Sequence, residues 1–260
     1  MFKTSSSPAV ALLVALSLAG VWPNFCAAGI NCSEDEADSF SSVVRVADTR
    51  KETHCTGVLF RGRYVLTAAH CLYAGSGQDR GPAQARNLRI FLGPDGDRQG
   101  PAISRFEIHP EYQGEFRDGE QFDVAVLELE AALSGGLDAD FRDIPRRSKV
   151  FVAGYGVTVS GEWKADGKRR IGENEIGRVD TDFICLKKTT LPPPEEPMPE
   201  RTGCVPAGQD SGGPLILDGK IKGVLSKSLQ VWLQDGSTSD ESCYVNFQNP
   251  QVRAFLENFF

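Results

Sequence analysis

The stretch GQDSGGP, residues 208–214, decides how this 260-residue chain is interpreted. It ends in two glycines and a proline, which are unfavourable inside helices and strands and favoured in tight turns. The turn surrounds an acid, Asp210, and a hydroxyl, Ser211, while the bulky Gln209 stands just before them. The sequence therefore predicts a special backbone conformation built around Ser211.

The body of the chain alternates short apolar runs with turns rich in Gly, Asp and Pro. Many short strands without interleaved helices are typical of an all-β barrel or sandwich. One helix is expected at about 249–259, where Asn249 caps it, Pro250 suits its first position and apolar residues recur with helical spacing. The runs that predict strands are 42–47, 56–60, 64–69, 88–93, 123–129, 149–156, 213–226 and 243–247.

Residues 1–29 have the features of a signal peptide. Lys3 precedes an apolar run, 9–20, that is too short to span a bilayer. The small residues of FCAAG (25–29) allow a cut after Gly29 or Ala28, and a cut after Ala19 is an alternative. Since no other long apolar stretch follows, the sequence predicts no membrane span and a secreted protein, extracellular or periplasmic.

Charge and cysteine content exclude several kinds of function. The net charge of -7 argues against a nucleic-acid partner, because phosphate binding requires clustered Lys and Arg. Of 7 Cys, Cys26 lies in the signal segment, and the remaining six allow up to three disulfides in an oxidising compartment. With 3 His and no C-x-x-C pair, no zinc site and no other cofactor are expected.

Two further motifs join GQDSGGP. LTAAHC (66–71) ends an apolar strand with His70, and FDVAVLEL (122–129) begins another strand with Asp123. The order His, Asp, Ser is one of the orders in which nucleophilic serine triads occur. The nucleophile elbow of α/β-hydrolases is excluded, because it needs Gly two residues before the serine, where this chain has Gln209.

Through TAAHC (67–71), FDVAVLEL and DSGGP (210–214), the chain resembles the trypsin/chymotrypsin-like serine proteases. HPEY (109–112), AGYGVT (153–158) and GVLSKS (223–228) extend the resemblance to roughly residues 30–260. The resemblance implies an all-β fold of two six-stranded antiparallel Greek-key barrels with a C-terminal helix, and an active site in the cleft between the barrels. The barrels would occupy about 30–145 and 146–247.

The resemblance also implies the role of each motif residue. His70 would take the proton of Ser211 as the hydroxyl attacks a carbonyl, and Asp123 would orient His70. The backbone N–H groups of Gln209 and Ser211 would form the oxyanion hole. The family usually has Gly at the position of Gln209, so two outcomes are open. Either the hole forms with Gln209 at positive φ, or the peptide turns away until substrate binds.

A new N-terminus is the second element that the resemblance implies. The α-ammonium of Ile30, exposed by signal cleavage, would pair with Asp210 without a separate activation peptide. The departure from the family is INCS (30–33), where two glycines usually follow the first two residues.

Disulfides are implied between Cys55 and Cys71 and between Cys204 and Cys243. Cys32 would then pair with Cys185, and a Cys185–Cys204 bridge is the alternative. The Cys55–Cys71 and Cys204–Cys243 pairings follow the family pattern, in which one bridge lies beside the histidine and another braces the substrate pocket; the pairing of Cys32 with Cys185 is what these two leave.

The substrate pocket implied by the resemblance contains Val205 at its floor and Ser226, Lys227 and Ser228 along one wall. No Asp falls at the floor, so cleavage after Lys or Arg is not supported, and a small or medium apolar residue before the cut is favoured. Lys227 is expected to be solvated. The partners would be protein or peptide substrates, and the chain is expected to be a monomer. The alternative function is a catalytically impaired family member that acts as a binding protein.

Overall fold

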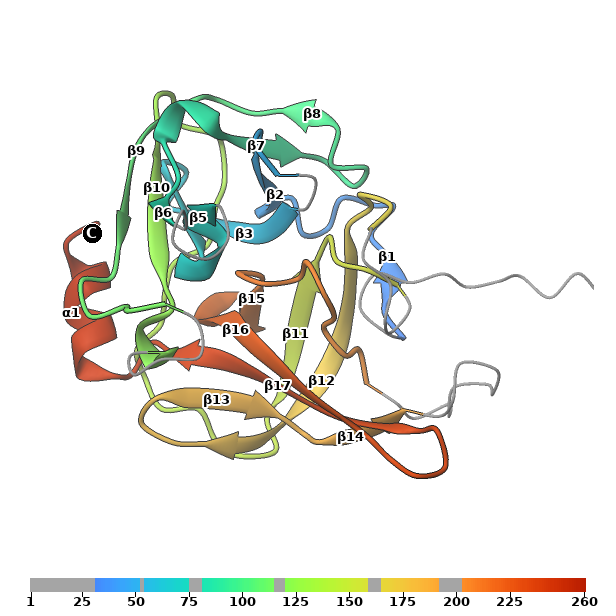
Figure 1. Cartoon of the computed structure of the whole chain (residues 1–260). Coiled ribbons are helices and arrows are strands. Elements are labelled where there is room, and N and C mark those ends of the chain that lie inside the picture. Colours follow the sequence, from blue (N-terminus) through green and yellow to red (C-terminus); the bar gives the residue numbers. More distant parts are fainter. Residues whose placement is uncertain (1–30, 52–53, 75–80, 115–119, 159–164, 192–202) are drawn as a thin grey trace, which may run out of the picture.

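The computed structural model describes residues 31–51, 54–74, 81–114, 120–158, 165–191 and 203–260. These residues form two large curved antiparallel sheets, a separate two-stranded sheet and one C-terminal α-helix (Figure 1). The expected signal segment, 1–29, and Ile30 lie outside the described residues. Within the described part of the chain, no helix is long and apolar enough to cross a membrane.

The N-terminal sheet has seven strands and curls without closing. Its two outermost strands, β8 and β9, each pair with a single neighbour. In spatial order the strands are β8 (Arg98–Gln99), β7 (Leu88–Leu92), β2 (Val43–Asp48), β3 (His54–Phe60), β4 (Tyr64–Thr67), β10 (Ala125–Leu129) and β9 (Ile103–Ile108). Short elements join them: η1 (Ala69–Leu72), β5 (Tyr73–Ala74), β6 (Gly81–Pro82), η3 (Ala85–Asn87) and η4 (Glu120–Phe122).

The C-terminal sheet closes into a barrel of six strands, because β12 pairs with β11 on one side and with β13 on the other. In order these strands are β12 (Arg170–Val179), β11 (Lys149–Gly154), β15 (Pro214–Leu217), β16 (Lys220–Trp232), β17 (Thr238–Asn246) and β13 (Phe183–Leu186). Two short strands extend this sheet: β1 (Ser33–Glu34) beside β12, and β14 (Thr189–Leu191) beside β17.

The fold class expected from the sequence is confirmed: two antiparallel β units and a C-terminal helix, with the N-terminal unit a curled half-barrel. The helix α1 (Pro250–Glu257) begins as its sequence predicts. Asn249 Oδ1 accepts hydrogen bonds from the backbone N–H of Gln251 and Val252. The buried side of the helix packs into the same hydrophobic cluster as the N-terminal sheet. The helix therefore covers the N-terminal sheet.

A buried ion pair fixes the segment that follows β1. Arg169 and Asp35 are almost completely buried, and Arg169 Nε donates to Asp35 Oδ2 at 3.0 Å. Asp35 also accepts the backbone N–H groups of Ser39 and Phe40, so its carboxylate is satisfied by several donors. Breaking such a pair leaves an uncompensated buried charge. The described start of the chain is therefore held against β12.

Candidate active site

His70 and Asp123 are brought together by two loops of the N-terminal sheet. His70 lies in η1, directly after β4, and Asp123 lies between η4 and β10, the neighbour of β4. Asp123 accepts from the backbone N–H of His70 at 2.8 Å through Oδ1, and its Oδ2 lies 2.8 Å from His70 Nδ1. The carboxylate is buried and the imidazole is 13% exposed. Asp123 therefore fixes both the backbone and the ring of His70, with Nδ1 as the nitrogen that faces the acid.

Ser226 joins this pair from the C-terminal barrel. Its Oγ donates to Asp123 Oδ2 at 2.8 Å, so the same oxygen receives a hydroxyl and faces the imidazole. Ser226 lies in β16, and Asp123 belongs to the other sheet. The contact therefore fixes the two β units against each other beside His70. The sequence placed Ser226 in a substrate pocket, and its bond to Asp123 was not predicted.

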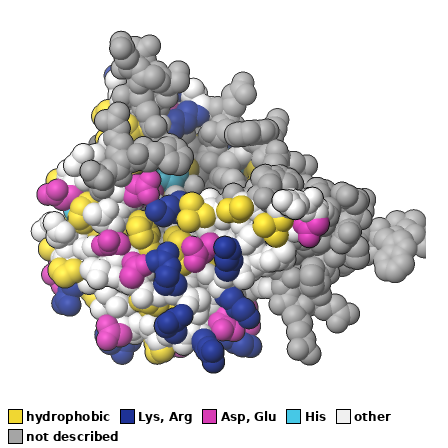
Figure 2. Space-filling view, turned by 60° about the horizontal axis from the view of Figure 1, so that its bottom comes forward, with side chains coloured by type: hydrophobic (Ala, Val, Ile, Leu, Met, Phe, Trp, Pro, Cys, Tyr) yellow, Lys and Arg dark blue, Asp and Glu magenta, His cyan; other side chains and the backbone are white. Residues whose placement is uncertain are grey.

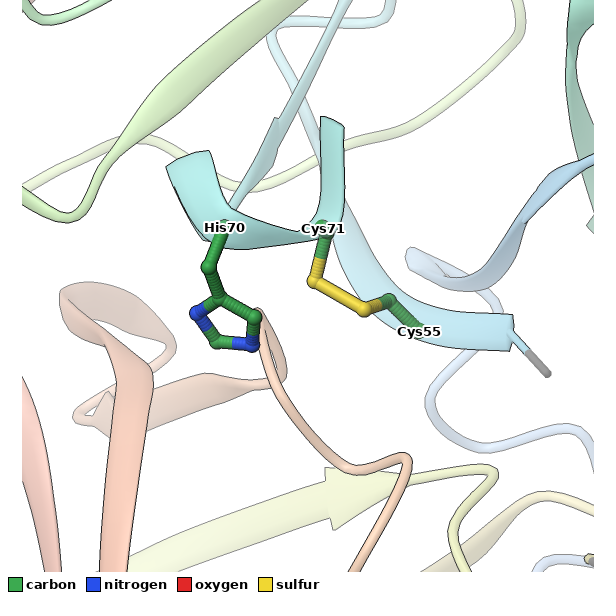
Figure 3. A group of neighbouring side chains, drawn as sticks. All are labelled: Cys55, His70 and Cys71. Atoms are coloured by element: carbon green, nitrogen blue, oxygen red, sulfur yellow. A yellow bond between two sulfur atoms is a disulfide. The ribbon is translucent and has the colours of Figure 1, made fainter. Parts of the chain in front are cut away.

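The turn that contains Ser211 reaches the same region. The backbone carbonyl of Ser211 accepts from Thr56 N at 2.9 Å, and Cys71 Sγ lies 3.7 Å from the same oxygen. Cys71 follows His70 directly, and its disulfide to Cys55 lies beside the imidazole (Figure 3). The backbone of Ser211 therefore contacts Thr56 of β3 and the Cys55–Cys71 disulfide, next to His70.

Gln209 takes the backbone conformation that usually requires glycine. Its φ is 71°, in the left-handed region, which costs a non-glycine residue roughly 1–2 kcal/mol. Its carbonyl accepts from Thr56 Oγ1 at 3.3 Å, and the same hydroxyl accepts from Tyr155 N at 3.0 Å. Thr56 therefore joins this strained turn to Tyr155, the residue that follows β11, the first of the six strands of the C-terminal barrel along the chain. The sequence did not single out Thr56, which stands two residues before the apolar run 58–60 in an ordinary strand.

Asp210 is fully buried behind the turn. Its Oδ1 accepts from Gly156 N at 2.7 Å and its Oδ2 from Ala207 N at 2.9 Å. A Cβ on Gly154 would lie 2.0 Å from Asp210 Oδ1, which explains why this part of GYG (154–156) has no side chain. Burial raises the pKa of Asp210 to about 6, against the two N–H donors and the charge of Arg170, which lower it.

A small cavity of about 10 Å³ adjoins Asp210, and Cys32 lines it together with Arg170 and Cys204. Cys32 is two residues from Ile30 in sequence, and two extended residues span about 7 Å. Cys32 therefore lies at the cavity beside Asp210, and Ile30 is two residues before it in the chain. The expected pairing between Ile30 and Asp210 lies outside the described residues, because Ile30 does.

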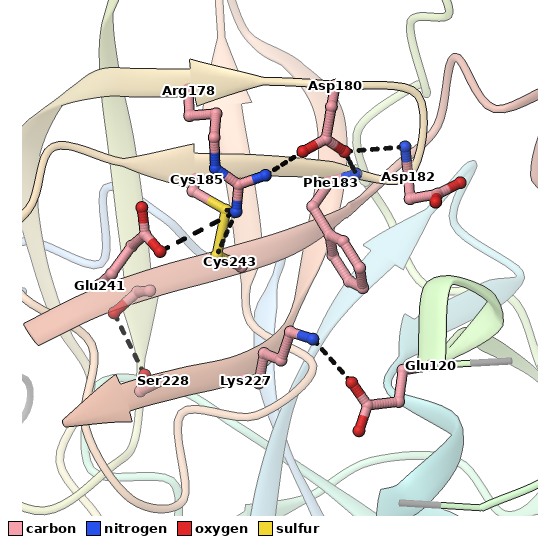
Figure 4. Close-up of a disulfide and its surroundings, with 11 residues drawn as sticks. Glu120, Arg178, Asp180, Asp182, Phe183, Cys185, Lys227, Ser228, Glu241 and Cys243 are labelled. Carbon is pink, nitrogen blue, oxygen red and sulfur yellow. Dashed lines mark hydrogen bonds and ion pairs between the residues drawn. A yellow bond between two sulfur atoms is a disulfide. The ribbon is translucent and has the colours of Figure 1, made fainter. Parts of the chain in front are cut away.

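The three disulfides are Cys55–Cys71, Cys32–Cys204 and Cys185–Cys243. The first was predicted. The expected Cys204–Cys243 bridge is wrong, as are Cys32–Cys185 and Cys185–Cys204. The reason is register: β13 and β17 are antiparallel neighbours, and Cys185 stands directly opposite Cys243 (Figure 4).

Lys227 is paired rather than solvated, which corrects the expectation from sequence. Its Nζ donates to Glu120 Oε2 at 2.6 Å and lies 4.3 Å from the centre of the Phe183 ring (Figure 4). Glu120 stands three residues before Asp123. The ion pair therefore joins β16 to η4 close to the Asp123–His70 pair. The Lys227 ammonium that could bind an acidic substrate side chain is already paired with Glu120.

The other expected pocket residues lie near this strand. Val205 is buried, and the Oγ of Ser228 lies 3.5 Å from the Pro206 carbonyl and 3.1 Å from Ser242 Oγ. Neither contact involves a charged group. The polar contacts of Ser228 are therefore neutral, whereas Lys227 and Glu120 form a charged pair on the same strand.

Two clusters contain side chains of the metal-binding types. They are Cys55, His70 and Cys71, and Cys185, Glu241 and Cys243. In both clusters the two sulfurs are joined in a disulfide, whereas zinc is bound by free thiolates. Neither cluster has the donor set of a zinc site while its bridge is intact.

A family model described as Trypsin matches residues 30–249. The chain belongs to the trypsin family. Granzyme M of Rattus norvegicus is 27% identical over 84% of this chain and 86% of its own length. The Trypsin of Phaedon cochleariae is 27% identical over 66% of this chain and 67% of its own. The serine protease Hayan of Drosophila melanogaster is 28% identical over 76% of this chain, which spans 31% of Hayan.

Solved structures of this trypsin-like fold superpose on the chain at low identity. Neuropsin, a serine protease of mouse brain, has a TM-score of 0.62 at 16% identity, over 88% of this chain and 99% of its own. Human heparin binding protein has a TM-score of 0.60 at 19% identity, over 88% and 97%. At these identities the likeness establishes the two-barrel fold alone.

Proposed function

We propose that this trypsin-family chain is a secreted serine endopeptidase that cleaves peptide bonds through an acyl-enzyme. In this mechanism Ser211 is the nucleophile, His70 the general base and Asp123 the group that orients His70. The observation that supports the proposal best is the Asp123 carboxylate, which binds both the backbone and the ring of His70 beside the Ser211 turn.

The chemistry follows from these positions. Ser211 Oγ attacks the carbonyl carbon of the substrate, while His70 Nε2 takes the hydroxyl proton. The oxygen becomes an oxyanion, which the backbone N–H groups of Gln209 and Ser211 stabilise. Loss of one such donor costs roughly 2.7–4 kcal/mol in a comparable enzyme. His70 then gives its proton to the leaving amine as the C–N bond breaks, and water hydrolyses the ester by the same steps.

Activation would come from the N-terminus. A cut after Gly29 gives Ile30 an α-ammonium within reach of the cavity beside Asp210, whose buried carboxylate then gains a cation. Because the cavity is small, docking of Ile30 has to widen it. The burial of Asp210 supports this role: burial raises its pKa to about 6, and an adjacent cation would stabilise the ionised carboxylate.

The proposed specificity is for a small or medium apolar residue before the cut. The supporting observations are the buried Val205, the neutral contacts of Ser228 and the pairing of Lys227 with Glu120. The proposed partners are protein or peptide substrates, and the proposed protein is a monomer in the extracellular space or the periplasm. Three disulfides support an oxidising compartment.

A fluorophosphonate probe tests the proposal directly. The purified chain beginning at Ile30 should be labelled at Ser211 at neutral pH, and Ser211→Ala and His70→Ala should not be labelled. Ser42→Ala, which changes a serine in the turn before β2, is the matched control and should be labelled like the wild type. A folded chain that neither takes the label nor cleaves any peptide would instead be a binding protein.

A further inference from the structure

The strand that carries Ser226 continues well beyond the site. β16 has 13 residues and runs from Lys220 to Trp232. Its pairing with β17 continues to the end, with Leu229 opposite Glu241 and Val231 opposite Ser239. On its other side β15 pairs only with residues 220–224. Beyond Leu225 this edge has no strand partner within the described part of the chain.

This open edge begins at the Ser211 turn. Leu225 exchanges two backbone hydrogen bonds there: its carbonyl accepts from Gly212 N at 2.7 Å, and its N–H donates to Gly213 at 2.8 Å. The next residue is Ser226, which binds Asp123. A peptide with its reacting carbonyl at Ser211 therefore meets the open edge directly.

The open edge of β16 has backbone N–H and C=O groups that can form hydrogen bonds with a further strand. At the end of the β16–β17 hairpin, Leu233 N donates to Ser237 O and Leu233 O accepts from Gly236 N, so both backbone groups of Leu233 face the β17 side. Hydrogen-bonded and non-hydrogen-bonded pairs alternate along an antiparallel ladder. Val231 and Leu229 therefore bond to β17, and residues 228, 230 and 232 direct their N–H and C=O groups to the open edge.

A row of exposed apolar side chains accompanies this edge. Leu229 is 49% exposed, Val231 54% and Leu233 41%. Alternate residues of a strand share one face, so these three form a row, which we call the apolar row. Figure 2 shows hydrophobic side chains in a row across the lower face of the molecule, with acidic and basic side chains beside them. Lys227, held by Glu120, is the next residue on the same face and ends the apolar row on the side of Asp123.

We propose that the open edge of β16 and the apolar row bind the substrate segment that lies four to eight residues before the cut. The proposal rests on the proposed peptidase function and deepens it. The segment would add a strand to β16, with main-chain hydrogen bonds for affinity and alternate side chains for selection. Continuity decides the occupant, because the open edge of this strand begins at Ser226, beside the Ser211 turn and the proposed pocket for the residue before the cut.

Register defines which substrate residues are selected. With the residue before the cut opposite Ser226, the third residue back lies opposite 228 and the fourth opposite Leu229. Directly opposed residues of an antiparallel pair point to the same face. The fourth, sixth and eighth residues before the cut then contact Leu229, Val231 and Leu233, and apolar side chains are preferred at those positions.

Three peptides and two variants test the proposal. All peptides share the residues around the cut; one ends three residues before it, and two extend eight residues before it. Of the long ones, one has Leu or Val at the fourth, sixth and eighth positions, and the other has Ser or Thr. The test variant is Leu229→Ser/Val231→Ser/Leu233→Ser. The control is Phe151→Ser, an exposed apolar residue of β11 that is 41% exposed.

The wild type should cleave the long apolar peptide with kcat/KM about tenfold higher than the long polar one, since partial burial of three side chains contributes on this scale. The triple variant should lose this preference and keep its kcat/KM on the short peptide, and Phe151→Ser should behave as the wild type. Equal cleavage of both long peptides by the wild type, or a preference kept by the triple variant, would overturn the proposal.

Binding and sedimentation separate the remaining outcomes. In Ser211→Ala the long apolar peptide, carrying a fluorophore, should bind about tenfold more tightly than the polar one, and the triple substitution should remove this difference. This measurement tests the apolar row even where the wild type cleaves no peptide, an outcome that contradicts the peptidase function alone. A wild-type dimer that the triple variant separates into monomers would assign the apolar row to a second copy of the chain and overturn the proposal.

Discussion

Ser226 donates its hydroxyl to Asp123 across the junction of the two β units, at 2.8 Å. The accepting oxygen, Oδ2, is the one that faces the ring of His70. A carboxylate held from both sheets has little freedom to rotate, so the orientation of His70 depends on residues of both. We therefore assign Ser226 a positioning role in the proposed mechanism.

Ser226→Ala should lower kcat for a short peptide by about tenfold and leave KM nearly unchanged. A hydrogen bond to a charged group contributes about 1.5–3 kcal/mol, and part of it would be replaced by water. Ser226→Thr keeps the hydroxyl and is the matched control. Steady-state kinetics separate the roles, because a rise in KM at constant kcat would place Ser226 in contact with substrate instead.

Gln209→Gly should raise the free energy of unfolding by about 1 kcal/mol, because glycine adopts positive φ without the Cβ penalty. Asp218→Gly is a control of the same kind, since Asp218 has a φ of 51° in an exposed hairpin turn. Urea denaturation should show a similar gain for both. Labelling of Ser211 should stay within about twofold of the wild type in both, since the N–H of residue 209 is retained. A large gain in labelling for Gln209→Gly alone would indicate that Gln209 turns the oxyanion N–H away.

The charge of Asp210 should make stability depend on pH before processing. Its pKa is raised from 3.8 to about 6 in the folded state, so the folded chain binds more protons than the unfolded chain between these values. The free energy of unfolding should therefore fall as pH rises from about 4 to 6, by up to about 3 kcal/mol. Urea denaturation of the wild type and Asp210→Asn from pH 4 to 7 measures this, and the difference between the two isolates the fall due to Asp210 from the opposite contribution of His54 and His109, whose pKa values are lowered by burial.

The processed chain should behave differently. An α-ammonium of Ile30 beside Asp210 lowers the pKa of this carboxyl and stabilises its charged form. A chain that begins at Ile30 should then lack the fall that Asp210 contributes between pH 4 and 6, while a chain with one extra residue before Ile30 should retain it. Identical pH profiles for the two chains would contradict the pairing of Ile30 with Asp210.

The features of the fold and the site that depend on short local motifs were predicted from the sequence. Strand composition gave the all-β class, and Asn249 and Pro250 placed the helix. The motif order selected His70 and Asp123, which the structure brings into contact. These signals are local because turn chemistry, capping and alternation act over a few residues.

Contacts that depend on register and on distant segments were missed. The pairing of Cys185 with Cys243 follows from the alignment of β13 with β17, which cysteine spacing does not encode. Lys227 stands in a strand like any surface lysine, and its partner Glu120 is 107 residues away. A strand prediction over the apolar residues before Cys185 would have been the one local signal for that bridge.

The two bridges of the C-terminal barrel should differ in their effect on the site. Cys32→Ala/Cys204→Ala and Cys185→Ala/Cys243→Ala should each lower the free energy of unfolding by about 2–5 kcal/mol, the usual cost of losing a native disulfide. Only the first should slow labelling of Ser211, by about tenfold, because Cys204 lines the cavity of Asp210 and begins the segment that leads into the Ser211 turn.

The two variants should differ because different contacts hold each pair of cysteine positions together once the disulfide is removed. Cys185 and Cys243 lie on strands that stay hydrogen-bonded to each other, so the barrel keeps its register without the sulfurs. Cys32 and Cys204 are 172 residues apart, and their bond holds the described segment that begins at Asn31 beside Asp210. Urea denaturation and the rate of fluorophosphonate labelling, measured on the same samples, separate stability from site geometry. Equal slowing of Ser211 labelling in both variants would mean that the geometry of the Ser211 turn depends on the stability of the whole barrel and not on the Cys32–Cys204 disulfide in particular.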